Sequence, residues 1–123
     1  MRQCTAWEKA GAKVFARSLR YPTSWPQEKA QEKGIDVLLA IDFIRLGMED
    51  TYDVAILAST DTDLVPALEF ILNRPLSKKV EVAAWWSQKA TNYLRVKGHS
   101  VWCHRLDLRA FNTVSDKRDY TLP

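Results

Sequence analysis

The fold of this chain is constrained most strongly by a continuous apolar run, Val54–Ala58, which ends in the polar stretch Ser-Thr-Asp-Thr-Asp. A short apolar run with polar ends is typical of a strand buried on both faces of a parallel sheet, so we expect a central strand here. Residues 64–72 follow with a helical pattern, and Pro66 fits the first helical turn, where its missing N–H does no harm. A buried strand that leads directly into a helix predicts an α/β fold.

The other predicted elements alternate in the same way. Between residues 35 and 46 apolar side chains occupy most of the helix circumference, so we expect that helix to be largely buried. Gly47 and Gly98 are expected to end helices, and Ser87 is expected to begin one. The predicted elements are a helix over 1–10, a strand over 12–19, a loop over 20–34, a helix over 35–46, a strand over 80–85, a helix over 88–97, a strand over 101–106 and a tail without a clear pattern. This order predicts a mostly parallel sheet with helices on its faces, in one domain over residues 1–123.

The composition is that of a globular protein, because 46% of the residues are hydrophobic and only 27% are charged. The net charge of +3 is compatible with nucleic-acid binding but does not predict it. No apolar run approaches the length of a membrane span, so we expect no membrane association. Cys4 and Cys103 lack metal-ligand spacing, and we expect no disulfide and a cytoplasmic location.

Two acids, Asp61 and Asp63, follow the predicted strand 54–58 with one residue between them. Parallel sheets bind ligands beyond the carboxyl ends of their strands, which is where these acids fall. Two adjacent carboxylates repel each other unless a cation or N–H donors compensate them, and Mg²⁺ prefers carboxylate oxygens. The sequence therefore favours a divalent-metal site, with the alternative that one aspartate caps the following helix.

Two further acids lie in the helix predicted over residues 35–46. Asp36 falls in its first turn, where a carboxylate faces a site or a partner, complements the helix dipole, or pairs with Lys33. Asp42 lies on a different face and precedes Arg45 by three residues, so we expect it to be a structural acid or one that orients a site residue.

Three stretches of the sequence together resemble a known family. They are EKGIDVLLAIDFI, YDVAILASTDTDLVPALEFI and VEVAAW, and they are similar to the NYN domain, a branch of the PIN-like nucleases that includes the LabA-type proteins. The family pattern has a Lys-x-x-Asp spacing and a strand that ends in Ser-x-Asp-x-Asp, followed by an aromatic or aliphatic residue and Val-Pro. The matching positions are Lys33, Asp36, Ser59, Asp61, Asp63, Leu64, Val65 and Pro66.

The resemblance implies a Rossmann-like, PIN-like three-layer sandwich and a metal-dependent ribonuclease that acts on RNA phosphodiester bonds. It implies that Asp36, Asp61 and Asp63 hold Mg²⁺ or Mn²⁺ or position a water. The family begins with a strand that ends in Asp-x-x-Asn, and this sequence is expected to lack it. We therefore expect an N-terminally incomplete sheet, which is either marginally folded or completed by a second copy, another chain or a rearranged segment in the place of that strand.

Two alternatives to the ribonuclease stay open. The first is an RNA-binding or regulatory module that keeps the fold without the chemistry, with basic side chains on phosphates and Trp25 stacked on a base; the same groups can equally be solvated surface. The candidate substrate contacts are Arg17, Arg20, Lys29, Lys33 and Ser59. The second is a haloacid-dehalogenase-like phosphatase, which is less favoured because its Asp-x-Asp normally follows the first strand. His99 and His104 are expected to be core or surface residues.

Overall fold

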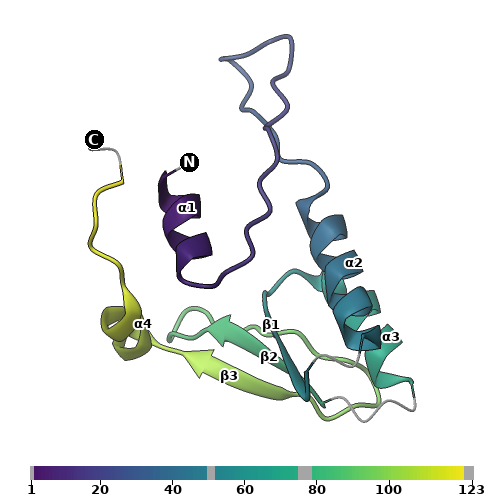
Figure 1. Cartoon of the computed structure of the whole chain (residues 1–123). Coiled ribbons are helices and arrows are strands. Elements are labelled where there is room, and N and C mark those ends of the chain that lie inside the picture. Colours follow the sequence, from purple (N-terminus) through teal and green to yellow (C-terminus); the bar gives the residue numbers. More distant parts are fainter. Residues whose placement is uncertain (1, 50–51, 75–78, 121–123) are drawn as a thin grey trace. The chain divides into compact units, whose positions relative to one another are not determined.

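The structure, a computed structural model, describes residues 2–49, 52–74 and 79–120. The chain forms two compact units, residues 1–35 with 116–123 and residues 36–115, each of which is considered by itself. In chain order the elements are α1 (Arg2–Lys9), α2 (Ile35–Met48), β1 (Val54–Ala58), the 3-10 helix η1 (Thr62–Leu64), α3 (Val65–Leu72), β2 (Lys79–Trp85), β3 (Trp102–Leu106) and α4 (Leu108–Val114) (Figure 1). None of the described helices is long and apolar enough to cross a bilayer.

The three described strands form one parallel sheet in the order β1-β2-β3. Figure 1 shows the three arrows side by side, pointing the same way. Leu57 of β1 lies beside Val82 of β2, which in turn lies beside Cys103 of β3. The predicted α/β fold with a parallel sheet is confirmed, as are the strands expected over residues 54–58, 80–85 and 101–106.

One face of the sheet carries the hydrophobic core. Neighbouring strand positions in this register point to the same face, which places Leu57, Val80 and Val82 together against α3. Leu68 of α3 is fully buried there, and complete burial of such a side chain contributes about 1.5–3 kcal/mol. The buried cluster consists of Phe43, Leu57, Leu64, Ala67, Leu68, Ile71, Val80, Val82, Leu94 and Val96.

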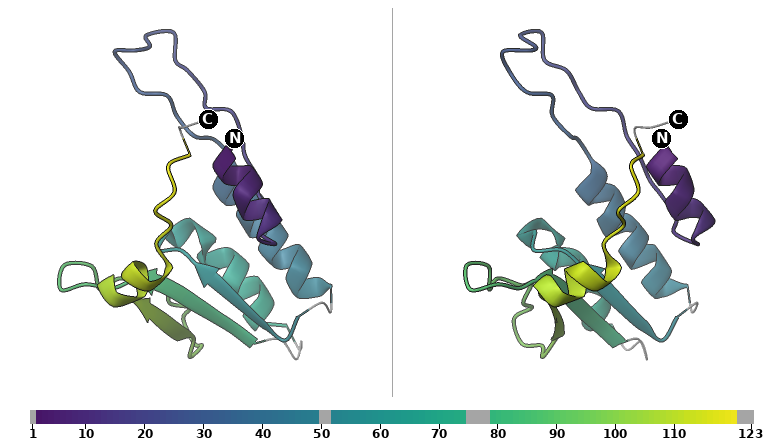
Figure 2. Two further views of the ribbon diagram at one scale, coloured as in Figure 1. Left: turned by 60° about the vertical axis from the view of Figure 1, so that its left-hand side comes forward. Right: turned by 90° about the vertical axis from the view of Figure 1, so that its left-hand side faces the viewer.

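Gly47 does not end its helix, as the sequence analysis expected, because α2 continues to Met48. It is instead a buried packing position. A Cβ at Gly47 would lie 2.5 Å from Cδ1 of Ile71 in α3 and 3.0 Å from the Tyr52 hydroxyl. The absence of a side chain lets α2 and α3 approach each other closely, and they lie next to each other in Figure 2.

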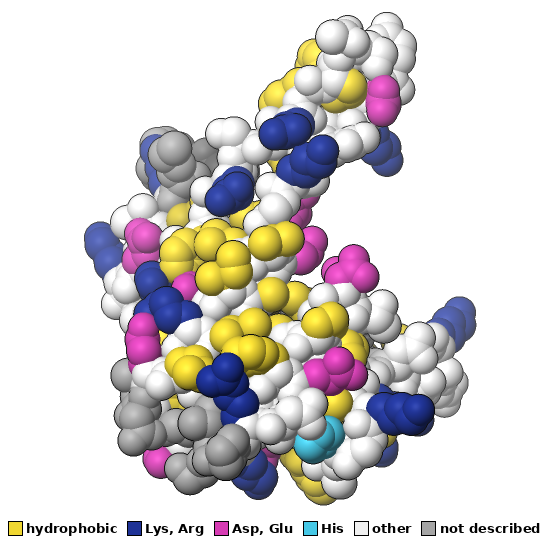
Figure 3. Space-filling model, turned by 90° about the vertical axis from the view of Figure 1, so that its right-hand side faces the viewer, with side chains coloured by type: hydrophobic (Ala, Val, Ile, Leu, Met, Phe, Trp, Pro, Cys, Tyr) yellow, Lys and Arg dark blue, Asp and Glu magenta, His cyan; other side chains and the backbone are white. Residues whose placement is uncertain are grey.

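The predicted burial of α2 and of β1 was wrong. Only Phe43 and Gly47 of α2 are buried, while Val37 is 62% and Ile41 55% exposed. β1 is an edge strand of the described sheet rather than a central one, and its Ile56 is 54% exposed. Figure 3, which views the molecule from the right-hand side of Figure 1, shows hydrophobic side chains gathered at the surface. Apolar composition records what a segment is able to bury, but burial itself depends on which neighbours are present.

Three further predictions about elements were wrong. Residues 12–19 form no strand, and the pairing described near them is an isolated antiparallel bridge between Arg20 and Gln31. Residues 88–97 form no helix. Leu94 and Val96 are buried while Arg95 between them is exposed, an alternation that a helix does not produce. The tail expected to lack a pattern contains α4, which Asp107 caps. The helix expected at the N-terminus is present as α1.

Candidate functional site

The loop after β1 is organised by Asp61. Its backbone is extended, and its carboxylate accepts a hydrogen bond from the Asp63 N–H at 2.9 Å. Its own N–H donates to Oγ of Ser59 at 3.0 Å, and its carbonyl accepts from the Leu64 N–H at 3.2 Å. Asp61 therefore caps η1, which leads directly into α3. The helix-cap alternative considered from the sequence describes one of the roles of this residue.

The cap leaves part of the acidic pair free. Only one oxygen of Asp61 accepts the Asp63 N–H. Asp63 is exposed, and its carboxylate has no hydrogen-bond or ion-pair partner among the residues described. The Asp63 carboxylate and the second oxygen of Asp61 are therefore available as hard oxygen donors. Mg²⁺ binds donors of this kind while it keeps several of its waters.

Asp36 does not form a three-residue metal-holding group with this pair. It is exposed in the first turn of α2, where its charge complements the helix N-terminus. Within residues 2–49, 52–74 and 79–120, no three His, Cys, Asp or Glu side chains are grouped so that they could hold a metal ion. Asp42 is the structural acid expected, because its Oδ1 lies 3.2 Å from the Arg45 guanidinium.

A pocket of about 530 Å³ opens at the carboxyl edge of the sheet, next to the acidic loop. Ser59 and Thr60, which precede Asp61, form one side of it, and Lys89 and Asn92 come from the segment after β2. Lys89, Asn92 and Trp85 line this pocket and were not among the residues singled out from the sequence. Their position was the available signal, because residues that end or follow parallel strands meet at the same edge.

Comparison with protein families decides the assignment. A family model for the NYN domain matches residues 3–100. The chain belongs to the NYN domain family. The match confirms the resemblance seen in the sequence, and the PIN-like nuclease fold of this family agrees with the parallel α/β sheet. Searches of curated proteins and of solved structures gave no match.

The NYN-type acidic loop and the predicted basic contacts lie in different units. Ser59 is half-buried, accepts the Asp61 N–H and lines the pocket. Arg17, Arg20 and Lys33 belong to the unit formed by residues 1–35 and 116–123, and all three are exposed. A substrate role for those three residues stays a prediction.

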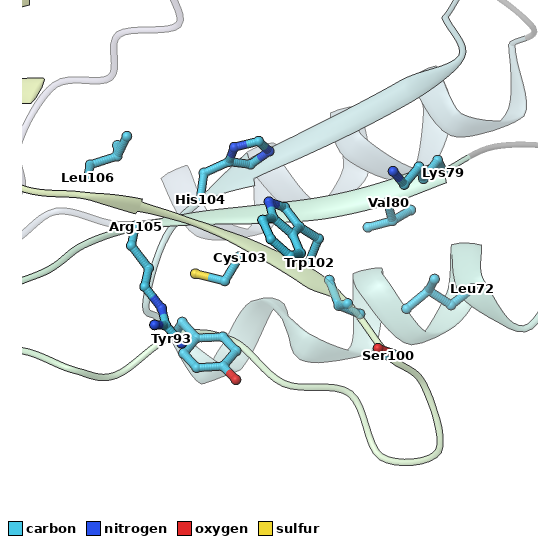
Figure 4. Close-up of a pocket in the computed structure, with 11 residues that line it drawn as sticks. Leu72, Lys79, Val80, Tyr93, Ser100, Trp102, Cys103, His104, Arg105 and Leu106 are labelled. Carbon is cyan, nitrogen blue, oxygen red and sulfur yellow. The ribbon is translucent and has the colours of Figure 1, made fainter.

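A second charged cluster lies on the sheet itself, where the sequence showed only an isolated histidine. Glu81 of β2 is 7% exposed, and its carboxylate contacts the Lys79 ammonium at 2.7 Å and Nε2 of His104 at 2.6 Å. The hydrogen bond from Lys79, followed by that from His104, lowers the pKa of Glu81. His104 lines a groove of about 790 Å³ along β3, and Figure 4 shows it on the opposite side of the strand from Arg105. These three partners satisfy one another, so the cluster has a structural role.

Proposed function

We propose that this NYN domain is a metal-dependent ribonuclease that hydrolyses RNA phosphodiester bonds at the Asp61–Asp63 loop. The observation that carries the proposal is the exposed Asp63 carboxylate beside a capping Asp61, at the carboxyl edge of a parallel sheet in a nuclease-type fold. Ligands of such sheets bind at this edge. The family assignment also favours a nuclease over a phosphatase.

Asp61 and Asp63 are the residues proposed to hold Mg²⁺ or Mn²⁺. Such an ion, when bound, polarises a phosphodiester and lowers the pKa of a bound water. The cap fixes the orientation of the Asp61 carboxylate before any ligand arrives, since the Asp63 N–H and the Ser59 hydroxyl both restrain the loop. The proposed role of Asp36 is to position a water rather than to complete a three-carboxylate group. The proposed partner is RNA.

A second candidate function is RNA binding without cleavage. The observation that favours it is that Asp36, Asp61 and Asp63 do not form a three-ligand group within the described residues. Such a module would bind RNA at the pocket beside the acidic loop. Its carboxylates would not be grouped so as to hold the ion for hydrolysis.

Cleavage of a labelled single-stranded RNA, with Mn²⁺, with Mg²⁺ or with EDTA, separates the two functions. We expect cleavage only with the metal, and a fall of more than ~10-fold in Asp61→Asn and in Asp63→Asn, because changes around a metal site commonly cost ~10–100-fold. Asp107→Asn is the matched control, because Asp107 also caps a helix with its carboxylate, at 2.9 Å from the Ala110 N–H. Full cleavage by folded Asp61→Asn would refute the assigned role. RNA binding without metal-dependent cleavage would establish the second candidate.

A further inference from the structure

The pocket next to the acidic loop has features of its own that no metal role explains. We call it the Trp85 pocket, and all of its lining belongs to the unit of residues 36–115. It measures about 530 Å³, which is sufficient for one nucleotide-sized group. Its lining consists of Ala58, Ser59, Thr60, Ala83, Ala84, Trp85, Lys89, Ala90, Asn92 and Leu106.

The floor of the Trp85 pocket is hollow because the strands carry alanine there. Ala58, the last residue of β1, lies beside Ala83 of β2, and both point to the sheet face opposite the core. The next residues on that face are large, namely Ile56 along β1 and Trp85 along β2. Two methyl groups between large side chains leave a depression at the carboxyl end of the strands.

The wall of the pocket is an indole held in place by a second aromatic ring. Trp85 is 54% exposed, and its ring meets Phe111 of α4 edge to face, with centroids 6.0 Å apart. The edge-to-face contact orients the indole while leaving much of its surface open. An oriented, exposed indole is the kind of platform on which unpaired bases stack in proteins that bind single-stranded nucleic acid.

The rim of the pocket supplies a positive charge on a restrained turn. Oγ of Ser87 accepts the N–H groups of Lys89 and Ala90 at 3.2 and 3.0 Å. The predicted helix cap is therefore a turn, and it presents Lys89 and Asn92 to the pocket. The Lys89 ammonium suits a phosphate, and the Asn92 amide offers both donors and an acceptor to a base or a ribose.

Ser59 joins the Trp85 pocket to the acidic loop. Ser59 lines the pocket, and its Oγ accepts the Asp61 N–H at 3.0 Å. A strand whose phosphate lies at Asp61 and Asp63 therefore has the pocket directly beside it for a neighbouring nucleotide.

We propose that the Trp85 pocket binds one unpaired nucleotide of an RNA strand, with the base stacked on the Trp85 indole and a phosphate at Lys89. This proposal rests on RNA as the substrate of the proposed function, but it does not require cleavage. It predicts a preference for single-stranded over duplex RNA, because the bases of a duplex are already stacked and paired.

Binding of a labelled oligouridylate to the full chain, measured by fluorescence anisotropy in EDTA, tests the pocket without any chemistry. Loss of one stacking platform corresponds to a fall in affinity of ~5–150-fold, so Trp85→Ala should weaken binding by about tenfold. Lys89→Gln should weaken binding severalfold and reduce the salt dependence, since each phosphate contact on a single strand contributes a slope of ~0.7. The matched controls Trp102→Ala and Lys97→Gln alter exposed residues outside the pocket and should stay within twofold of the original affinity.

Two further measurements keep the test decisive. Trp85→Phe retains an aromatic ring beside Phe111 and should lose less affinity than Trp85→Ala; an equal loss would refute stacking. A uridylate–adenylate duplex should bind more weakly than the single strand and be insensitive to Trp85→Ala. Equal losses in Trp85→Ala and Trp102→Ala, or unchanged binding by both Trp85→Ala and Lys89→Gln, would overturn the proposal. Failure of the ribonuclease proposal appears separately, as binding without cleavage in Mn²⁺.

Discussion

Asp61 has two roles that a pair of substitutions can separate: its side chain caps η1, and its charge is proposed to help hold a metal ion. Asp61→Ala removes both the cap acceptor and the charge. Asp61→Asn removes only the charge, because an asparagine side-chain oxygen caps helices about as well as that of aspartate.

The structure sets the size of the expected effect on stability. The hydrogen bond from the Asp63 N–H is 2.9 Å long, whereas the backbone bond from the Leu64 N–H to the Asp61 carbonyl does not depend on the side chain. Replacement of a capping residue by alanine costs ~0.5–2 kcal/mol, and the exposure of Asp61 places it near ~1 kcal/mol. In a domain of this size that corresponds to a fall in Tm of roughly 3–6 °C. Asp61→Asn should stay within about 0.5 kcal/mol of the original stability.

If Asp61 helps to hold a metal ion, Asp61→Ala and Asp61→Asn should weaken metal binding alike, although they differ in their effect on stability. Both substitutions should weaken Mn²⁺ binding at least ~10-fold, since mutation of residues that merely hydrogen-bond to metal ligands already lowers metal affinity that much. Thermal unfolding measures the first quantity and isothermal titration with Mn²⁺ the second. Asp107→Ala and Asp107→Asn provide the comparison, because the Asp107 carboxylate caps α4 through a hydrogen bond of the same length, 2.9 Å, and should show the stability pattern alone.

Two results would refute this reasoning about Asp61. If Asp61→Asn destabilises the fold as much as Asp61→Ala, the carboxylate charge rather than the cap acceptor supports the loop. If Asp61→Asn binds Mn²⁺ as tightly as the original chain, Asp61 is a structural cap and the proposed metal site loses its better-oriented ligand.

Two predictions concern stability elsewhere in the unit of residues 36–115. Gly47→Ala should destabilise the fold despite a helix-propensity gain of ~1 kcal/mol, because overpacking against Ile71 costs ~1–3 kcal/mol, and Ile71→Val should relieve part of the loss in the double variant; a higher Tm for Gly47→Ala alone would contradict the packing seen here. Because Lys79 and then His104 lower the pKa of Glu81, its charge stabilises the fold above the ordinary carboxyl range of ~4.3, and that stabilisation is lost as the pH falls below it. Glu81→Gln should therefore be less stable at neutral pH and less sensitive to acid in urea unfolding, and parallel pH profiles would show that the cluster contributes nothing.

The strand, acidic loop and helix between residues 54 and 72 were predictable because their signals are local. Five apolar residues, an aspartate at the turn and Pro66 at the helix start each restrict the backbone through short-range sterics and hydrogen bonds. The NYN assignment rested on the same stretch and on the Lys33–Asp36 spacing, and the family match confirms it.

The segments that were predicted wrongly depend on neighbours far away in the sequence. Residues 12–19 alternate like a strand, but a strand also needs a partner for its backbone groups, and the bridge described there joins only Arg20 and Gln31. Leu94 and Val96 fit a helical or a non-helical segment equally well on composition, and the non-helical conformation is the one that buries both in the core.

The sequence by itself determined which groups of this protein stand at the carboxyl edge of the sheet, because the order of strands and helices places Asp61 and Asp63 there. Only the tertiary structure decided how those groups are used. It assigned one Asp61 oxygen to a cap, left the Asp63 carboxylate open, and placed Trp85, Lys89 and Asn92 around a hollow floored by Ala58 and Ala83. Hydrogen bonds and cavities arise between residues that the register of the strands brings together, and no local pattern in the sequence specifies that register.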